Sequence, residues 1–341
     1  MSRKSALVIA PGRGTYNKEE LGYLQRFHAD KVALFARFDQ QRQAQGQESI
    51  RALDGAERFS LSKFTRGDNA SALIHSCAYG DFLSIDQNQF DVVAVTGNSM
   101  GWYTALACAG AVSAEDGFTI VNTMGRLMQE ALIGGQLIYP FVDENWQPIP
   151  GKKQDVLDLI DAIDGLYLSI DLGGMLVLAG TKEALVEAEL RLPVVQERFP
   201  MRLQNHAAFH SPLQNPVADL GRNLLGADLF RSPKLSMIDG RGHCWMAHGA
   251  EPVQVHDYTL DHQVVEPYDF TKAIQNGLRE YCPDVLIILG PGKTLGGAVA
   301  QSLIDCNWQG LSSKQDFLDR QKSDPIVLSM GMEGQREMVT G

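Results

Sequence analysis

The sequence predicts an α/β protein in two parts: a large subdomain built on a parallel sheet, and a small subdomain inserted into it. Short apolar runs bounded by glycine or proline occur at 6–10 and 285–290, and such runs are typical of buried parallel strands. Between 136 and 207 the pattern changes to strand, helix, two strands, helix and strand, which is the order of a ferredoxin-like βαββαβ unit. We therefore expect 1–135 and 208–341 to form the large subdomain and 136–207 the small one.

The elements of the inserted part each have a local signal. A turn at Gly173-Gly174 separates two apolar runs and predicts a hairpin, and Thr181 is placed to cap the helix that follows it. The expected elements are a strand at 137–142, a helix at 154–163, the hairpin strands at 166–170 and 175–180, a helix at 181–190 and a last strand at 200–203.

Helices of the large subdomain are expected where apolar residues recur at helical spacing. Ser113, followed by Glu115 and Asp116, is an N-cap with acidic residues in the first turn. The expected helices are at 71–83, 113–130, 213–225 and 270–281, with one more after 297; further strands are expected at 235–239 and 324–330, and 17–55 is polar and largely helical. The last ten residues show no clear pattern, so we expect them to fray.

Composition places limits on function. The chain has 341 residues, 44% of them hydrophobic and 21% charged, with a net charge of −11, which argues against nucleic-acid binding. An acidic carrier protein would need a local basic patch to dock on such a surface. The five cysteines are scattered without zinc-like spacing, so reduced thiols are expected. No apolar run is long enough for a signal peptide or a membrane span, so the expected location is cytoplasmic.

The stretch 91–101 carries the strongest functional signal. An apolar strand runs into Gly97-Asn98-Ser99-Met100-Gly101, and a helical pattern follows at once. A G-x-S-x-G sequence between a strand and a helix is the nucleophile elbow of hydrolase-like folds, which exposes the serine at the carboxyl edge of the sheet. The free N–H groups at the start of the helix would stabilise negative charge developing there. The alternative is an ordinary strand–turn–helix connection that happens to contain a serine.

Four segments occur together in an order typical of one family. They are Pro11-Gly-Arg-Gly14, Gly97-Asn-Ser-Met-Gly101, Ala207-Ala-Phe-His-Ser-Pro-Leu213 and Gly290-Pro-Gly-Lys-Thr-Leu295. Over nearly its whole length the chain resembles the malonyl-CoA:acyl-carrier-protein transacylases and the acyltransferase domains of fatty-acid and polyketide synthases.

The resemblance implies acyl transfer through an acyl-serine. Ser99 would be the nucleophile, and His210 the base that takes its proton. The backbone N–H groups of Arg13 and Met100 would form the oxyanion hole, and Gln263 would help to hold the site. The substrates would be an acyl-CoA and the phosphopantetheine thiol of an acyl carrier protein, with no cofactor. The alternative for His210 is a capping residue before Ser-Pro.

Two departures from the family bear on the acyl group. Asn98 stands where the family has histidine; it offers hydrogen bonds near the nucleophile without a charge, so it should tune catalysis. Met124 aligns with the arginine that pairs the malonyl carboxylate, and Arg126 is rotated by about 200° on the helix. We therefore expect either a monocarboxylic acyl group, walled by Met124, or a malonyl group held in another way. The Arg13 side chain is the candidate for binding the malonyl carboxylate; the alternative is that it points to solvent.

Two more pocket residues and one possible metal site complete the sequence predictions. By resemblance, Phe209 favours malonyl over branched malonyl groups, and Trp102 replaces a family glutamate and makes the pocket less polar. His243, Cys244 and His248 lack a fourth ligand, so no metal is expected.

Three further functions are alternatives to transfer. The same acyl-serine attacked by water would make the chain a thioester hydrolase that clears acyl groups from carrier or CoA. A binding or regulatory protein would have kept the fold without the chemistry. An ordinary esterase is disfavoured because no convincing acid lies between Ser99 and His210.

Overall fold

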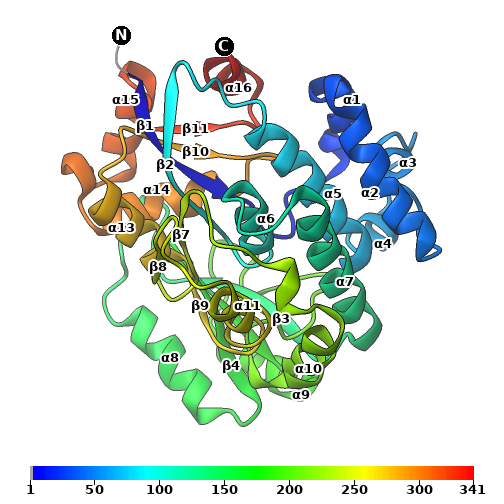
Figure 1. The fold of residues 1–341 in the computed structure, drawn as a ribbon. Helices are drawn as coiled ribbons and strands as arrows, with labels where there is room; N and C mark the ends of the chain where they lie inside the picture. Colours follow the sequence, from blue (N-terminus) through cyan, green and yellow to red (C-terminus); the bar gives the residue numbers. More distant parts are fainter. Residues whose placement is uncertain (1–2) are drawn as a thin grey trace.

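A six-stranded sheet forms the centre of the large subdomain in the computed structural model, which describes residues 3–341 (Figure 1). Its order is β11-β10-β1-β2-β7-β8; the first five strands are parallel and β8 is antiparallel to β7. The strands are β1 Lys4–Ala10, β2 Phe90–Gly97, β7 Ser236–Ile238, β8 Cys244–Trp245, β10 Val285–Ile288 and β11 Val327–Ser329.

The central strands are apolar along their length because helices cover both faces of this sheet. All four residues of β10 are buried. Helices α13 and α14 pack on one face, and α6 lies on the other with α5 and α7 behind it (Figure 1). Their bounds are α5 Gly67–Phe82, α6 Gly101–Cys108, α7 Ala114–Ala131, α13 Phe270–Tyr281 and α14 Gly296–Asp305.

The small subdomain has a second sheet of order β6-β3-β5-β4-β9. The first four strands are antiparallel neighbours in the order of a ferredoxin-like unit. The fifth strand, β9 (Tyr268–Asp269), comes from outside 136–207 and pairs in parallel with β4. The remaining elements are β3 Gly135–Pro140, α8 Lys152–Ala162, β4 Leu166–Leu172, β5 Met175–Gly180, α9 Lys182–Arg191 and β6 Met201–Arg202. The predicted fold class, a parallel-sheet subdomain with an inserted ferredoxin-like unit, is confirmed.

Shorter elements complete the chain. The α-helices are α1 Tyr23–Phe27, α2 Val32–Ala44, α3 Ile50–Asp54, α4 Leu61–Phe64, α10 Asn215–Leu224, α11 Pro252–Leu260, α12 His262–Val265, α15 Lys314–Ser323 and α16 Glu333–Thr340. The 3₁₀ turns are η1 Lys18–Glu20, η2 Ala29–Lys31, η3 Pro212–Gln214, η4 Ala227–Leu229 and η5 Trp308–Gly310. Across residues 3–341, every helix is too short or too polar to pass through a bilayer.

The expectation that the last ten residues fray is wrong. They form α16, and the guanidinium of Arg336 is buried in an ion pair with Asp81 of α5. Asp81 also accepts hydrogen bonds from the Tyr23 hydroxyl at 2.8 Å and from the Gly290 N–H at 2.7 Å. The helix is therefore held by partners far away in the sequence, and local periodicity gives no sign of them. Removing one member of such a buried pair typically costs about 3–5 kcal/mol.

Candidate active site

Ser99 lies on the sharp turn between β2 and α6, with a left-handed φ of 53°. This turn packs directly on the chain that leaves β1. A Cβ atom on Gly101 would lie 2.3 Å from the Ala10 carbonyl oxygen, and one on Gly12 would lie 2.7 Å from the Asn98 carbonyl oxygen. Glycine at these two positions therefore allows the two turns to meet at the nucleophile, as a nucleophile elbow requires.

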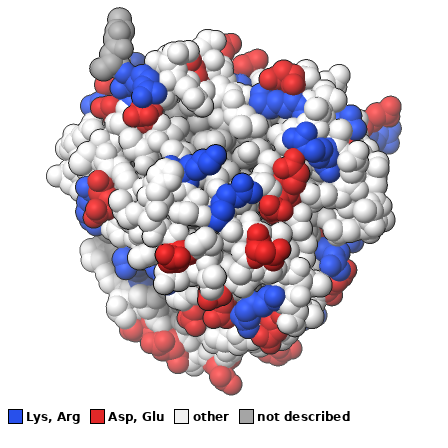
Figure 2. Space-filling model, in the orientation of Figure 1, with Lys and Arg blue, Asp and Glu red and all other residues white. Residues whose placement is uncertain are grey.

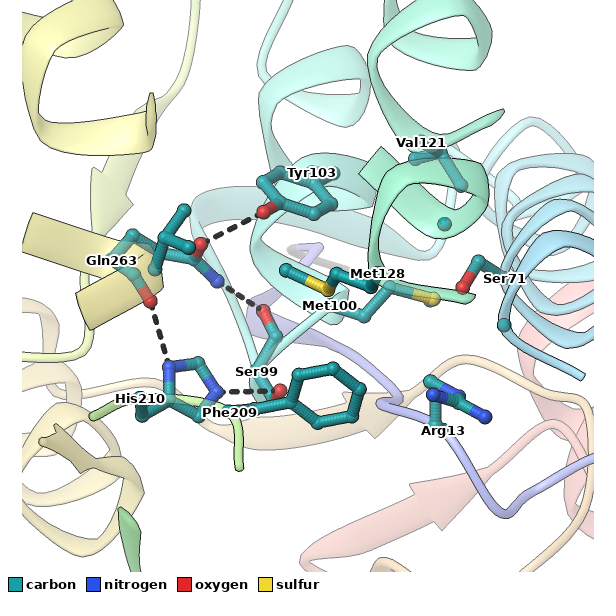
Figure 3. Close-up of a pocket in the computed structure, with 13 residues that line it drawn as sticks. Arg13, Ser71, Ser99, Met100, Tyr103, Val121, Met128, Phe209, His210 and Gln263 are labelled. Carbon is teal, nitrogen blue, oxygen red and sulfur yellow. Dashed lines mark hydrogen bonds between the residues drawn. The ribbon is translucent and has the colours of Figure 1, made fainter. Parts of the chain in front are cut away.

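His210 is placed to act as the base for Ser99. Its Nε2 lies 2.7 Å from Ser99 Oγ, and its Nδ1 lies 2.7 Å from the Gln263 backbone carbonyl oxygen (Figure 3). A carbonyl oxygen can only accept a hydrogen bond, so Nδ1 carries the proton and the Nε2 lone pair faces the serine. Burial lowers the pKa of His210 from 6.5 to about 4, so the ring is neutral at pH 7 and able to accept a proton.

Gln263 connects the nucleophile and the base. Its Nε2 donates to the Ser99 carbonyl oxygen at 3.1 Å, while its own backbone carbonyl orients His210. Its Oε1 accepts a hydrogen bond from the Tyr103 hydroxyl at 2.9 Å. Sequence reasoning missed Tyr103. The signal was its spacing, because residue 103 lies one helical turn after the serine and so on the same side of α6.

A cavity opens from Ser99 between α5, α6 and α7. Its walls are mainly apolar, and on α7 they come from residues spaced one helical turn apart. The lining residues are Arg13, Gly67, Ser71, Ser99, Met100, Tyr103, Val121, Gly125, Met128, Phe209, His210, Gln263 and Val264. Figure 3 shows Ser99, His210 and Gln263 on one side of this cavity and Arg13 and Ser71 on the opposite side.

Arg13 lines the cavity, and its side chain is partly buried. Its Nη2 donates to the carbonyl oxygens of Thr65 at 2.6 Å and Asn205 at 3.0 Å. Its guanidinium carbon lies 5.4 Å from the centre of the Phe209 ring. Its Nε is buried without a hydrogen-bond partner, and within residues 3–341 the guanidinium forms no ion pair. Burial lowers the pKa of Arg13 from 12.5 to about 10, so it remains charged at pH 7.

The N–H groups of Arg13 and Met100 are free to meet an oxyanion. Within the part of the chain that the structure describes, neither donates to a backbone or side-chain acceptor. Both belong to the turns that meet at Ser99, and Met100 immediately precedes α6. Two such donors are the elements of an oxyanion hole.

Met124 does not line the cavity, so the expectation that it walls the acyl pocket is wrong. It is fully buried, and its sulfur would lie 2.8 Å from a Cβ on Gly221. On α7, Val121, Gly125 and Met128 face the cavity, and Met124 lies at the flank of that stripe. The missing side chain at Gly221 leaves the space that the thioether fills.

Asn98 and Trp102 also lie outside the cavity lining. The Asn98 amide nitrogen lies 3.1 Å from the Cβ position of Gly12, and its Oδ1 is buried without a partner. Trp102 is fully buried and donates through Nε1 to Thr259 Oγ1 at 2.9 Å. The expectation that Trp102 makes the pocket less polar therefore does not act through the cavity lining, and the expected tuning of catalysis by Asn98 stays a prediction.

The remaining assignments concern charge and metals. Arg126 lies on the outer side of α7 and pairs with Glu130 at 3.1 Å. Across residues 3–341 the structure contains no group of three or more His, Cys, Asp or Glu side chains arranged to hold a metal ion.

Comparison with known proteins gives relatives but no matching family model. The chain is 26% identical to the malonyl CoA-acyl carrier protein transacylase of Bacillus subtilis over 210 residues, which are 60% of this chain and 62% of that protein. It is 25% identical over 228 residues to the polyketide synthase GfsB of Streptomyces halstedii, covering 65% of this chain and 4% of that protein. The matched segments thus span less than two thirds of these relatives.

The fold is similar along the whole chain. The crystal structure of the malonyl-CoA:acyl carrier protein transacylase of Xanthomonas oryzae superposes with a TM-score of 0.77 at 18% identity. The match covers 99% of this chain and 98% of that one. The predicted resemblance, in fold and in sequence, is confirmed.

Proposed function

We propose that this chain, a relative of the malonyl-CoA:acyl-carrier-protein transacylases in both sequence and fold, is an acyltransferase that works through an acyl-serine. The observation that carries the proposal is the pairing of Ser99 Oγ with His210 Nε2 at 2.7 Å, with Nδ1 held by a carbonyl, at the wall of an apolar cavity.

The geometry supports a two-step transfer. His210 takes the proton of Ser99 as Oγ attacks the thioester carbonyl of an acyl-CoA, and the oxyanion is stabilised by the N–H groups of Met100 and Arg13. The carbon–sulfur bond breaks, and His210 gives its proton to the departing CoA thiolate. A carrier-protein thiol then enters, His210 takes its proton, and the thiolate attacks the acyl-serine. Ser99 Oγ leaves and recovers that proton.

We further propose that the acyl group carries a free carboxylate, as malonyl does, and that Arg13 binds it. Three features support this: Arg13 lines the cavity, its guanidinium forms no ion pair within residues 3–341, and its Nε has no hydrogen-bond partner. Asp68 acts on this cation only from beyond ion-pair distance, so an anionic substrate in direct contact would offset more of the cost of burying it. A hydrogen bond between charged groups contributes about 1.5–3 kcal/mol. The cation–π contact with the Phe209 ring helps to keep the guanidinium in place.

The acyl acceptor is proposed to be the phosphopantetheine thiol of an acyl carrier protein. The net charge of −11 requires a local basic site for such an acidic partner. On the face that Figure 2 shows, acidic and basic side chains are interspersed, and no broad basic area stands out there.

The test is intact-mass spectrometry after brief incubation with malonyl-CoA, acetyl-CoA or a medium-chain acyl-CoA, with Ser99→Ala as the control. A malonyl adduct that the control lacks, and that a carrier protein discharges to acyl-carrier, is the expected result. An acetyl or longer adduct without a malonyl adduct would overturn the proposed role of Arg13, but the acyltransferase assignment would still hold. Free acid released at a rate independent of carrier would show a hydrolase. No adduct and no turnover would remove the catalytic assignment.

A further inference from the structure

Catalysis by Ser99 and His210 depends on the position of a short segment, α12. This segment supplies the carbonyl of Gln263, which fixes the proton of His210 on Nδ1. It also supplies the Val264 carbonyl oxygen, which accepts the His210 backbone N–H at 3.1 Å. His210 has a left-handed φ of 54°, so these contacts hold a strained residue. A four-residue helix has too few internal hydrogen bonds to keep this position by itself.

The Gln263 side chain ties α12 to the nucleophile turn. Its amide N–H₂ donates to the Ser99 carbonyl oxygen, and its amide oxygen accepts from Tyr103 (Figure 3). The amide has two orientations that differ by exchange of oxygen and nitrogen. The Ser99 carbonyl oxygen can only accept a hydrogen bond, so the Gln263 amide must present its nitrogen to it. A hydrogen-bond donor next to the amide oxygen favours this orientation over the flipped one.

Tyr103 is that donor. It is 3% exposed, and the Gln263 amide oxygen is the only hydrogen-bond partner of its hydroxyl within residues 3–341. Burial raises the pKa of Tyr103 above its usual value, so the hydroxyl stays protonated and continues to donate at any working pH.

We infer that Tyr103 is a positioning residue for the Ser99–His210 pair: its hydroxyl orients the Gln263 amide, which fixes α12 and thereby the base. This inference rests on the proposed function. The ring of Tyr103 also lines the cavity, so a competing explanation is that Tyr103 only shapes the acyl pocket. The two explanations differ, because the first acts through Gln263 and the second does not.

The test is a double-mutant cycle with Tyr103→Phe and Gln263→Leu. Tyr103→Phe keeps the ring and removes only the hydroxyl. The readouts are the rate of Ser99 labelling by a serine-directed phosphonate, kcat and KM for the acyl-CoA, and Tm. Tyr103→Phe should slow labelling and lower kcat about tenfold, the size expected for one unsatisfied buried acceptor, with KM within about twofold. In a Gln263→Leu background the same change should cost less than about twofold.

Tyr139→Phe is the matched control. Its hydroxyl is also buried, but it donates to the Pro193 carbonyl oxygen within the small subdomain at 2.8 Å. It should change Tm without slowing labelling. A tenfold loss from Tyr103→Phe that persists in the Gln263→Leu background, or a loss confined to KM, would overturn the inference. So would labelling of Tyr103→Phe at the wild-type rate. Wild-type protein that is not labelled at Ser99 would instead overturn the proposed function.

Discussion

The two sides of the cavity differ in how their polar groups are satisfied. On the side of the proposed nucleophile, Ser99, His210, Gln263 and Tyr103 satisfy one another through four hydrogen bonds between 2.7 and 3.1 Å. On the opposite side, Arg13 keeps an unpartnered Nε. The hydroxyl of Ser71 also has no hydrogen-bond partner within residues 3–341 and lies on the lining.

The difference indicates what each side is built for. Groups that act on every substrate gain from being fixed in advance, since no reorganisation is then needed during the reaction. Groups that select a substrate must keep hydrogen-bonding capacity in reserve for it, at a cost to the empty protein. The unpartnered Nε of Arg13 is therefore informative about specificity, and the satisfied network around Ser99 is informative about the chemistry.

Removing the nucleophile should have the largest effect. Ser99→Ala and His210→Ala are each expected to lower the rate of acyl transfer by at least about 10³-fold, because the members of such a pair act as a unit. If the rate of acyl transfer fell by 50-fold or less in both variants, the catalytic residues would have to lie elsewhere. Transfer is measured by acyl-carrier formation, with Tm showing that both variants are folded.

Changing Arg13 should alter selectivity more than rate. Arg13→Gln is expected to lower kcat/KM for malonyl-CoA about 10- to 100-fold while leaving acetyl-CoA within a few-fold, because one charge-assisted hydrogen bond contributes about 1.5–3 kcal/mol. The matched control is Arg126→Gln, because Arg126 is a partly exposed arginine outside the cavity lining whose partner is Glu130. An equal loss for both thioesters would show that Arg13 is structural only.

The pH dependence should report the burial of His210. A neutral ring is the active form, and its pKa is lowered from 6.5 to about 4, so activity should persist as the pH falls through 6 and 5. A histidine with the ordinary pKa of about 6.5 would keep about a tenth of its neutral form at pH 5.5. The measurement is phosphonate labelling of Ser99 between pH 4.5 and 8, and a midpoint at or above 6.5 would contradict the expected shift.

A control for stability belongs with this profile. The pKa of His75 is lowered to about 3 by burial, so below 6.5 the unfolded state binds a proton that the folded state does not. The free energy of unfolding should therefore fall as the pH drops below 6.5, and Tm at each pH shows where folding limits the labelling rate.

The smallest effect on selectivity is expected at Met124. Because its side chain packs toward Gly221 and not into the cavity, Met124→Leu should leave the malonyl-to-acetyl ratio of kcat/KM unchanged within about twofold and cost less than about 1.5 kcal/mol of stability. A shift in acyl selectivity would place residue 124 in the pocket after all. Met124→Ala should cost about 2–5 kcal/mol in the same unfolding measurement.

Part of the fold and of the site could be predicted because the signals were local. The strands β1, β2 and β10 were visible as continuous apolar runs, and the cap of α7 was visible as Ser113, whose Oγ accepts the Asp116 N–H at 3.0 Å. The helix α16 was missed because the ion pair that holds Arg336 joins residues 255 positions apart.

The sequence by itself determined the fold class and the pairing of a serine with a histidine, since a strand–turn–helix pattern and a family segment are written in consecutive residues. Only the tertiary structure decided which side chains line the cavity. Alignment placed Met124 in the pocket and did not decide the direction of the Arg13 side chain. In the structure, the packing of α7 on α10 buries Met124. The close approach of the Gly12 turn to the elbow brings Arg13 to the cavity. Side-chain direction depends on the packing of elements distant in sequence, and no local pattern encodes it.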